Sequence, residues 1–366
     1  MQSNEQLDLN LDAVTPPPIP PLLPVERKSW QKVQKFEFYG TASEYFGIWI
    51  VNILLILITL GLYSPWAKVR RLRYFYGNTA FYNRRFDFTG LPKKILIGRL
   101  IALTIWIGIS VASKLSYSIA SIGALLLYLA IPWLIRATLR FKARNSKFGN
   151  SRFYFSGENK EIYWVSLKAF LLVVFTMGIF YPVALWMYKR YSLDHLYVGQ
   201  LKFKLRAAWS AYMGAVYIPL LIFAAIMFVT GIVFALLIGV VGSGGIYFIS
   251  TVIAILYFIL FFFFYPLISA RLFMVTWNNT TISRSVFSTN CNQWRYAWIV
   301  GSNWIVRILS VGLMTPWCAI RLYRYQVESL QLELRNDPDE MLNRIQTDHS
   351  ALAEEITDIF DIDVSL

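Results

Sequence analysis

The sequence contains few of the residues from which catalytic and metal sites are usually built. Its 366 residues include two cysteines and two histidines. Cys291 and Cys318 show no metal or redox spacing, and His195 and His349 lie far apart in the chain. No Ser-His-Asp arrangement, phosphate-binding loop or pair of carboxylates within an apolar segment is present. These absences predict a protein that is not an enzyme and that holds no metal and no cofactor.

Charged residues are also scarce. They make up 15% of the chain, whereas 57% of it is hydrophobic and the mean hydropathy is +0.48. Soluble domains carry roughly 25% charged residues. The composition therefore excludes a disordered chain and favours a polytopic membrane protein.

Acidic residues are nearly absent from the middle of the chain. Between Tyr45 and Val327 there are 29 Lys and Arg against four Asp and Glu, a net charge of +25, whereas the whole chain carries +14. In so apolar a chain, a basic excess indicates anionic membrane lipids as partners rather than nucleic acid.

The two ends differ from this basic body. Residues 1–35 contain a proline run that favours extended polyproline II, and residues 331–366 are acidic. We expect two tails outside the membrane that recruit a protein partner. The N-terminal tail has no basic start followed by an apolar stretch, so we expect no cleavable signal peptide.

Seven apolar stretches approach or exceed the roughly 20 residues that a helix needs to cross a membrane. Their ends are rich in Trp and Tyr, as expected at the headgroup level. They are residues 45–66, 95–112, 118–135, 162–188, 212–241, 246–269 and 298–317. The sequence therefore predicts an all-α polytopic membrane protein with about seven membrane-embedded helices.

Five of these segments end in a proline, and other residues recur at fixed distances from it. Arginine follows eight residues later in four copies, and phenylalanine follows 21 residues later in four. The prolines are Pro65, Pro132, Pro182, Pro266 and Pro316. Matches at fixed offsets indicate an internal repeat.

The first, fourth and seventh segments form a class of their own. Each carries Thr or Ser six residues before the proline and Gly four residues before it: Thr59, Gly61 and Pro65; Thr176, Gly178 and Pro182; Ser310, Gly312 and Pro316. We interpret the repeat as one Gly/Pro-interrupted helix followed by a two-helix hairpin, present twice at residues 36–152 and 153–286. A lone interrupted helix then fills a partial repeat at residues 287–330.

Short alternating stretches separate the apolar segments. Residues 36–40, 86–90 and 153–157 each alternate aromatic and other residues and close on glycine. This pattern is typical of a short strand with a turn. We therefore predict short β segments that pair at the membrane surface.

The first interrupted segment resembles a known family. Its residues 59–70, TLGLYSPWAKVR, continue to Tyr74-Phe75 and to the stretch at 86–90, and are similar to the signature of the YjgN-like bacterial inner-membrane proteins. The resemblance covers residues 36–333 and implies a location in the inner membrane and a shared architecture. It implies no reaction, because the family has no assigned activity.

Two membrane topologies agree with these features. Apolar length favours seven crossings, since residues 45–66 carry no charge. The distribution of Lys and Arg favours interrupted segments that enter and return, because only Lys114 among the loop charges then lies outside. In both arrangements the basic clusters at 68–94 and 136–160 face the cytoplasm. We expect the C-terminal tail to be cytoplasmic.

Three sets of residues are candidates for ligand binding. The Thr/Ser, Gly and Pro residues of the interrupted segments free backbone groups at membrane depth, as in transporter sites. Lys168 and Arg307 lie inside apolar segments, where a charge is costly. The third set lies just past the membrane and suits an anion or a lipid headgroup: Arg70, Arg73, Arg136, Arg140, Arg190, Arg321 and Arg324.

The leading interpretation is a transporter or channel-like conduit for an anionic or lipidic ligand. The alternative is a non-catalytic scaffold that recruits partners through its two tails. For the arginines, the simpler reading is that they fix the topology and reach lipid phosphates.

Overall fold

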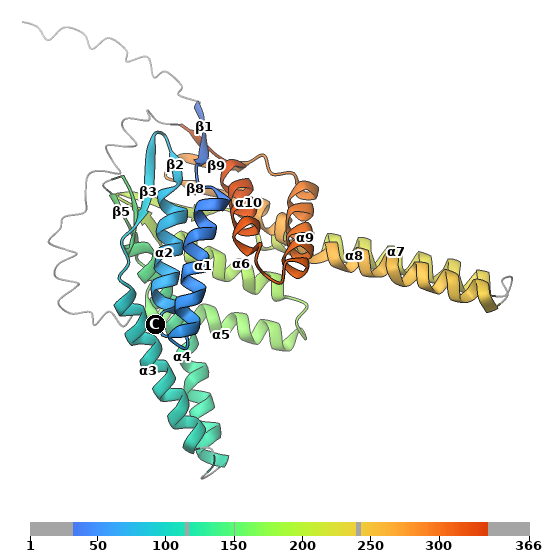
Figure 1. Ribbon diagram of the computed structural model, residues 1–366, viewed down its shortest axis with the longest axis horizontal. Coiled ribbons are helices and arrows are strands. Elements are labelled where there is room, and N and C mark those ends of the chain that lie inside the picture. Colours follow the sequence, from blue (N-terminus) through green and yellow to red (C-terminus); the bar gives the residue numbers. More distant parts are fainter. Residues whose placement is uncertain (1–31, 113, 115–116, 150, 239–242, 336–366) are drawn as a thin grey trace, which may run out of the picture.

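The computed structural model describes residues 32–112, 114, 117–149, 151–238 and 243–335 (Figure 1). Pairs of helices alternate with pairs of strands. The helices are α1 (Ala42–Ile58), α2 (Ser64–Gly77), α3 (Pro92–Ala112), α4 (Tyr117–Arg144), α5 (Asn159–Phe175), α6 (Tyr181–Asp194), α7 (Trp209–Ile238), α8 (Ser243–Asn278), α9 (Gln293–Leu309) and α10 (Thr315–Glu328). The strands are β1 (Lys32–Phe38), β2 (Thr79–Phe81), β3 (Arg84–Phe88), β4 (Ser146–Phe148), β5 (Ser151–Phe155), β6 (Leu196–Val198), β7 (Leu201–Leu205), β8 (Thr280–Ile282), β9 (Ser285–Thr289) and β10 (Leu330–Leu334).

The two predicted tails, with the protein partner expected for them, lie largely outside the described residues. Their inner ends do not: residues 32–35 belong to β1 and residues 331–334 belong to β10. Both ends of the described chain are therefore built into the fold.

The strands close into an antiparallel barrel in the order β1-β10-β9-β8-β7-β6-β5-β4-β3-β2. The first and last strands pair with Lys32 opposite Leu334, and β1 also pairs with β2, with Phe36 opposite Phe81. The short strands predicted at 36–40, 86–90 and 153–157 are confirmed as β1, β3 and β5, each of which ends two residues before the glycine. Their closure into a barrel was not predicted.

The helices form a ring that closes in the same way. Each helix packs against its neighbours in the chain, and α1 also packs against α10. We call α1, α3, α5, α7 and α9 the first helices of the five hairpins, and α2, α4, α6, α8 and α10 the second helices. A single residue separates each second helix from the strand that follows it. The second helices therefore lead directly into the barrel.

Two hairpins are much longer than the other three. By length and apolar composition, four of the described helices are able to cross a membrane: Pro92–Ala112, Ser121–Arg144, Trp209–Leu237 and Gly245–Asn278. They form the α3–α4 and α7–α8 hairpins, which project from the rest of the molecule in different directions (Figure 1). The chain is thus a helical membrane protein that carries a β-barrel.

The three interrupted segments are not single helices, which corrects the expectation drawn from apolar length. Residues 45–66 contain the end of α1, a turn and the start of α2, and these two helices pack against each other. Residues 162–188 and 298–317 are divided in the same way, between α5 and α6 and between α9 and α10. The apolar length was misleading because the segment turns back before it ends.

The turn itself explains the Thr-Gly-Pro spacing. The Thr59 hydroxyl donates to the Leu55 carbonyl at 2.7 Å and accepts from the Tyr63 amide at 3.0 Å. Gly61 adopts a φ of 91°, and its amide donates to the Ile56 carbonyl at 2.8 Å. These bonds satisfy polar backbone groups that the end of a helix otherwise leaves open. The second and third copies turn in the same way, at Thr176 and Gly178 and at Ser310 and Gly312.

The prolines of these three segments begin the second helix of each short hairpin. Pro65, Pro182 and Pro316 lie within the first two positions of α2, α6 and α10, where the missing amide hydrogen leaves no helical bond unmade. Pro132 and Pro266 instead lie inside the long helices α4 and α8. One sequence feature, a proline near the end of an apolar run, thus has two structural roles.

Five phenylalanines form a closed ring inside the barrel. Neighbouring ring centroids lie between 5.9 and 6.4 Å apart, with interplanar angles of 19° to 30°. The members are Phe36, Phe86, Phe153, Phe203 and Phe287, and four of them are the residues that recur 21 positions after a proline. We call this set the phenylalanine ring. It is part of the apolar core of the barrel.

Replacing Gly61 with alanine tests the hairpin turn. Because an L residue is strained at this positive φ, we expect G61A to reduce the free energy of unfolding by about 1–2 kcal/mol. Gly47, within α1 of the same hairpin, has open space around its Cα, so G47A should be neutral or slightly stabilising. Thermal unfolding in detergent measures both. Equal effects would contradict the role assigned to Gly61.

Candidate functional site

The residues predicted from the interrupted helices do not converge on one site. A Cβ atom added at Gly61 or Gly178 would meet nothing within 4 Å. The neighbouring tip residues Leu60, Met177 and Val311 are 94%, 95% and 91% exposed. Each Thr/Ser-Gly-Pro set therefore closes its own hairpin tip.

Three of the candidate arginines bond to backbone carbonyls where a strand leads into the next helix. Arg73 donates to the carbonyls of Phe88 and Gly90 at 3.2 and 3.3 Å. Arg136 donates to Gly157 at 2.6 Å, and Arg324 donates to Gly40 at 2.8 Å. These guanidinium groups join a second helix to the following hairpin.

The glycines at these junctions are needed for close packing. A Cβ atom at Gly157 would lie 2.5 Å from the Tyr191 hydroxyl and 2.7 Å from the ring of Phe155. At Gly40, it would lie 2.5 Å from the ring of Phe38. The alternating stretches close on glycine because the preceding aromatic ring folds back over that position.

The other candidate arginines lie beside aromatic rings or polar groups of their own hairpins. Arg70 lies over Tyr63 and Arg190 over Trp186, at 5.7 and 5.2 Å from the ring centroids. Arg321 donates to the Ser302 hydroxyl at 2.7 Å. Arg140 occupies in α4 the position that Arg73 has in α2. The arginines are thus distributed around the ring of helices.

The two charges predicted inside apolar segments have different surroundings. Lys168 of α5 is exposed and lines a cavity between α5 and α6. Arg307 of α9 has a buried Nε atom with no hydrogen-bond partner among the described residues. Of these two residues, Lys168 borders a space that is able to take a ligand.

A different set of residues does converge, next to the phenylalanine ring. A cavity of about 430 Å³ is bounded on one side by three members of that ring. Among the described residues, its helical lining comes only from second helices. One example from each is Tyr76 of α2, Lys142 of α4, Ser192 of α6, Trp277 of α8 and Tyr323 of α10. We call this space the central chamber.

One lysine lines the chamber, and lysines of two neighbouring second helices lie close enough to interact with it. Lys142 lines it, and its charge acts on both Lys68 of α2 and Lys189 of α6. Burial, and then the charge of Lys142, lowers the pKa of Lys189. All three side chains nevertheless remain accessible to water. A pKa lowered by burial, together with access to water, is typical of a lysine that faces a water-filled interior enclosed by protein.

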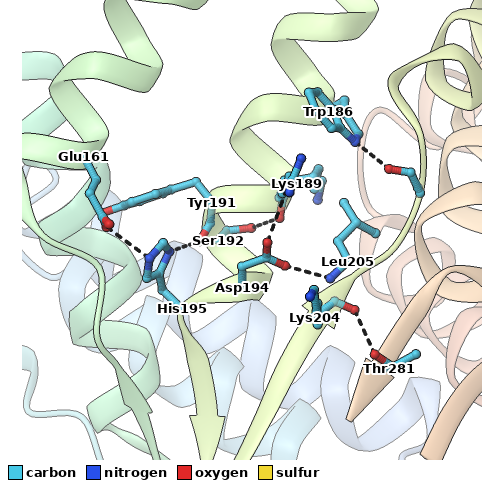
Figure 2. Close-up of polar contacts among 12 residues, drawn as sticks. Glu161, Trp186, Lys189, Tyr191, Ser192, Asp194, His195, Lys204, Leu205 and Thr281 are labelled. Atoms are coloured by element: carbon cyan, nitrogen blue, oxygen red, sulfur yellow. Dashed lines mark hydrogen bonds and ion pairs between the residues drawn. The ribbon is translucent and has the colours of Figure 1, made fainter. Parts of the chain in front are cut away.

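Within the described residues, no carboxylate neutralises these lysines. Among the described residues, Lys68, Lys142 and Lys189 form no ion pair. The nearby acidic groups have other partners: Asp194 accepts from the Leu205 amide at 2.8 Å, and Glu161 pairs with His195 at 3.0 Å (Figure 2). The Glu158 side chain caps the start of α5. The chamber is therefore positively charged, as an anion site requires.

Sequence reasoning did not single out these lysines. Lys68 and Lys142 were noted only within basic clusters, because a lysine near the end of an apolar segment is usually explained by snorkelling. The sequence did offer one indication for Lys68. This residue lies three positions after Pro65, in a polar helix that follows an apolar one. The convergence of three helices was not visible in the sequence.

Comparison with known proteins gives a family and a location. The inner membrane protein YjgN of Escherichia coli O157:H7 is 30% identical over 146 residues, which are 39% of this chain and 36% of that protein. The protein of the same name from Salmonella typhimurium is 31% identical over 130 residues, 35% of this chain and 32% of that protein. The chain thus matches about a third of the length of these curated relatives. No solved structure matches it significantly.

The similarity to inner membrane proteins and the membrane-length helices agree on where the protein resides, which is the inner membrane. The model of a family described as bacterial protein of unknown function (DUF898) matches residues 33–359, which include all of the barrel except the first residue of β1 and the whole ring of helices. The chain belongs to this family.

Proposed function

We propose that the protein is an inner-membrane conduit that binds a small anionic solute in the central chamber. The observation that carries this proposal is Lys142 in the lining of the chamber, with Lys68 and Lys189 near enough to be affected by its charge and with no carboxylate partner for the three among the described residues. Neutralising this charge with an anion lowers its electrostatic energy, and the low dielectric of the surrounding protein strengthens the attraction.

The two helices of a short hairpin differ in polarity, and this difference supports a water-filled interior. In the first of them, α1 is apolar along its length, whereas α2 carries Lys68 about one turn from the tip. Since the two helices pack side by side, Lys68 lies at the level of the apolar part of α1. A charge at that depth is tolerated only where it faces water or protein. The second helices therefore face a wet interior and the first helices face lipid.

The phenylalanine ring gives the conduit an apolar constriction. It bounds the chamber where the second helices lead into the barrel. Apolar constrictions of this kind control permeation in channels by excluding water. An anion held by the lysines would have to pass this ring in order to leave through the barrel.

We also propose a membrane topology with four crossings, by α3, α4, α7 and α8, and three short hairpins that enter and return. The exposed apolar tips at Leu60, Met177 and Val311 suit insertion into the hydrocarbon layer. The barrel and both tails lie on the cytoplasmic side, since nearly all Lys and Arg lie toward the barrel. This proposal retains the alternation of short and long hairpins that the proline offsets indicated.

Flux of sulfate into liposomes tests the conduit. We expect K142Q to reduce sulfate uptake about fivefold, because one lysine near an anionic group contributes about 1 kcal/mol. K114Q is the control, because Lys114 lies at the far end of the α3–α4 hairpin. Liposomes of phosphatidylethanolamine and phosphatidylglycerol suit the assay. The proposal fails if the wild-type protein neither binds nor passes sulfate, or if both variants behave alike.

The lowered pKa of Lys189 predicts a pH dependence. A depressed pKa means that the positive charge is lost at a lower pH than the value of about 10.4 for free lysine. Sulfate binding should therefore weaken as the pH rises from 7 to 10, although sulfate itself does not titrate there. K189R keeps its charge over this range and should reduce the decline, whereas the part due to Lys68, whose pKa is also lowered by burial, should remain. Isothermal calorimetry of both proteins checks this, and an unchanged decline in K189R would exclude Lys189 as its origin.

Cysteine labelling in intact cells tests the topology. Leu60 at a short-hairpin tip and Lys114 at a long-hairpin tip provide the contrast. A membrane-impermeant maleimide added from the periplasm should label K114C and should not label L60C. Labelling of both would instead show that the short hairpins reach the far surface, as seven crossings would require.

A further inference from the structure

A second place on the molecule combines an apolar groove with a group of cations. A cavity of about 390 Å³ lies between α4 and α5 and is lined mostly by apolar side chains, with Lys160 at one end. A second cavity, of about 660 Å³, lies between α5 and α6. Lys160 and Trp164 line both, so the two spaces adjoin along α5. We call the first the acyl groove and the second the polar cavity.

The polar cavity carries a surplus of positive charge. Lys160, Lys168 and Arg190 all line it. Of the carboxylates there, Glu161 pairs with His195 at 3.0 Å, and Asp194 accepts from the Leu205 amide and from Arg190 (Figure 2). In the part of the chain that the structure describes, neither Lys160 nor Lys168 has a carboxylate partner. A phosphate group would give these two lysines the partner that they lack.

The acyl groove has the dimensions of a hydrocarbon chain. Its α5 wall extends from Lys160 to Phe170, ten residues, which corresponds to about 15 Å of helix. On the α4 wall, Leu129 and Pro132 contribute apolar surface. The Tyr163 hydroxyl donates to the Leu129 carbonyl at 3.0 Å and so joins the two walls. The groove begins at the level of the barrel, where lipid headgroups would lie, and continues toward the apolar part of both helices.

We propose that one anionic phospholipid binds here, with its phosphate among Lys160, Lys168 and Arg190 and one acyl chain in the acyl groove. This site differs from general lipid contact because it joins three cations to an apolar groove shaped by two helices. It shares no residue with the central chamber and does not depend on the proposed conduit.

Titration of the delipidated protein with defined lipids, followed by native mass spectrometry, tests this site. The wild-type protein should bind the first phosphatidylglycerol molecule at least tenfold more tightly than phosphatidylcholine. The double variant K160Q/K168Q should lose most of this preference, since each lysine near an anionic headgroup contributes about fivefold. K160R/K168R should restore it, which excludes general damage to the fold.

Matched controls separate this site from nonspecific binding. Lys93 is the second residue of α3, as Lys160 is of α5, but it lines neither cavity, so K93Q should bind lipid as the wild type does. L167W fills the acyl groove and should weaken phosphatidylglycerol binding. L171W, one turn further along α5 and outside both cavities, should not.

The same titration distinguishes a lipid from a free phosphate. Inorganic phosphate should not displace phosphatidylglycerol at millimolar concentration, because it gains nothing from the acyl groove. The proposal is overturned if phosphate competes as well as the lipid, if phosphatidylglycerol and phosphatidylcholine bind equally, or if K93Q matches K160Q/K168Q.

Discussion

The pairing of β1 with β10 is the interaction on which the rest of the structure depends. It joins residues 32–35 to residues 331–334 and thereby removes the two free edges that an open sheet would expose. Because each second helix leads into a strand after a single residue, closure of the barrel also places the helices in a closed ring. The ring encloses an interior because the first and last strands of the described residues meet.

A ring of hairpins divides its helices by environment. In the topology that we propose, one helix of each hairpin faces lipid and the other faces the interior, and the sequences differ in polarity most clearly between α1 and α2. Arginines then bond three of the second helices, α2, α4 and α10, to the junctions where a strand leads into the next hairpin, as Arg73 and Arg324 show. At these junctions the arginine side chains donate mainly to backbone carbonyls. The lysines are therefore the basic side chains that remain available to line the interior.

At the chamber, burial disfavours the charged form of a lysine, whereas access to water favours it. Protein around Lys189 disfavours its charged form, yet the side chain is accessible to water and no described carboxylate pairs with Lys68, Lys142 or Lys189. Such a cluster stores repulsion that a bound anion relieves. The polar cavity beside α5, on the side that we propose faces lipid, also has an excess of positive charge. Its acidic side chains already interact with His195 and with a backbone amide.

The sequence by itself determined the membrane class, the location, the short strands and the residues that recur around each proline. These are local properties: apolar length, alternation and offsets are read directly along the chain. Apolar length failed at residues 45–66, because hydropathy does not register a turn at Gly61 in the middle of an apolar run. Barrel closure, the phenylalanine ring and the convergence of Lys68, Lys142 and Lys189 were decided only by the tertiary structure. Each of these joins residues that lie dozens or hundreds of positions apart, and no local pattern specifies which of the possible long-range pairings has the lowest free energy.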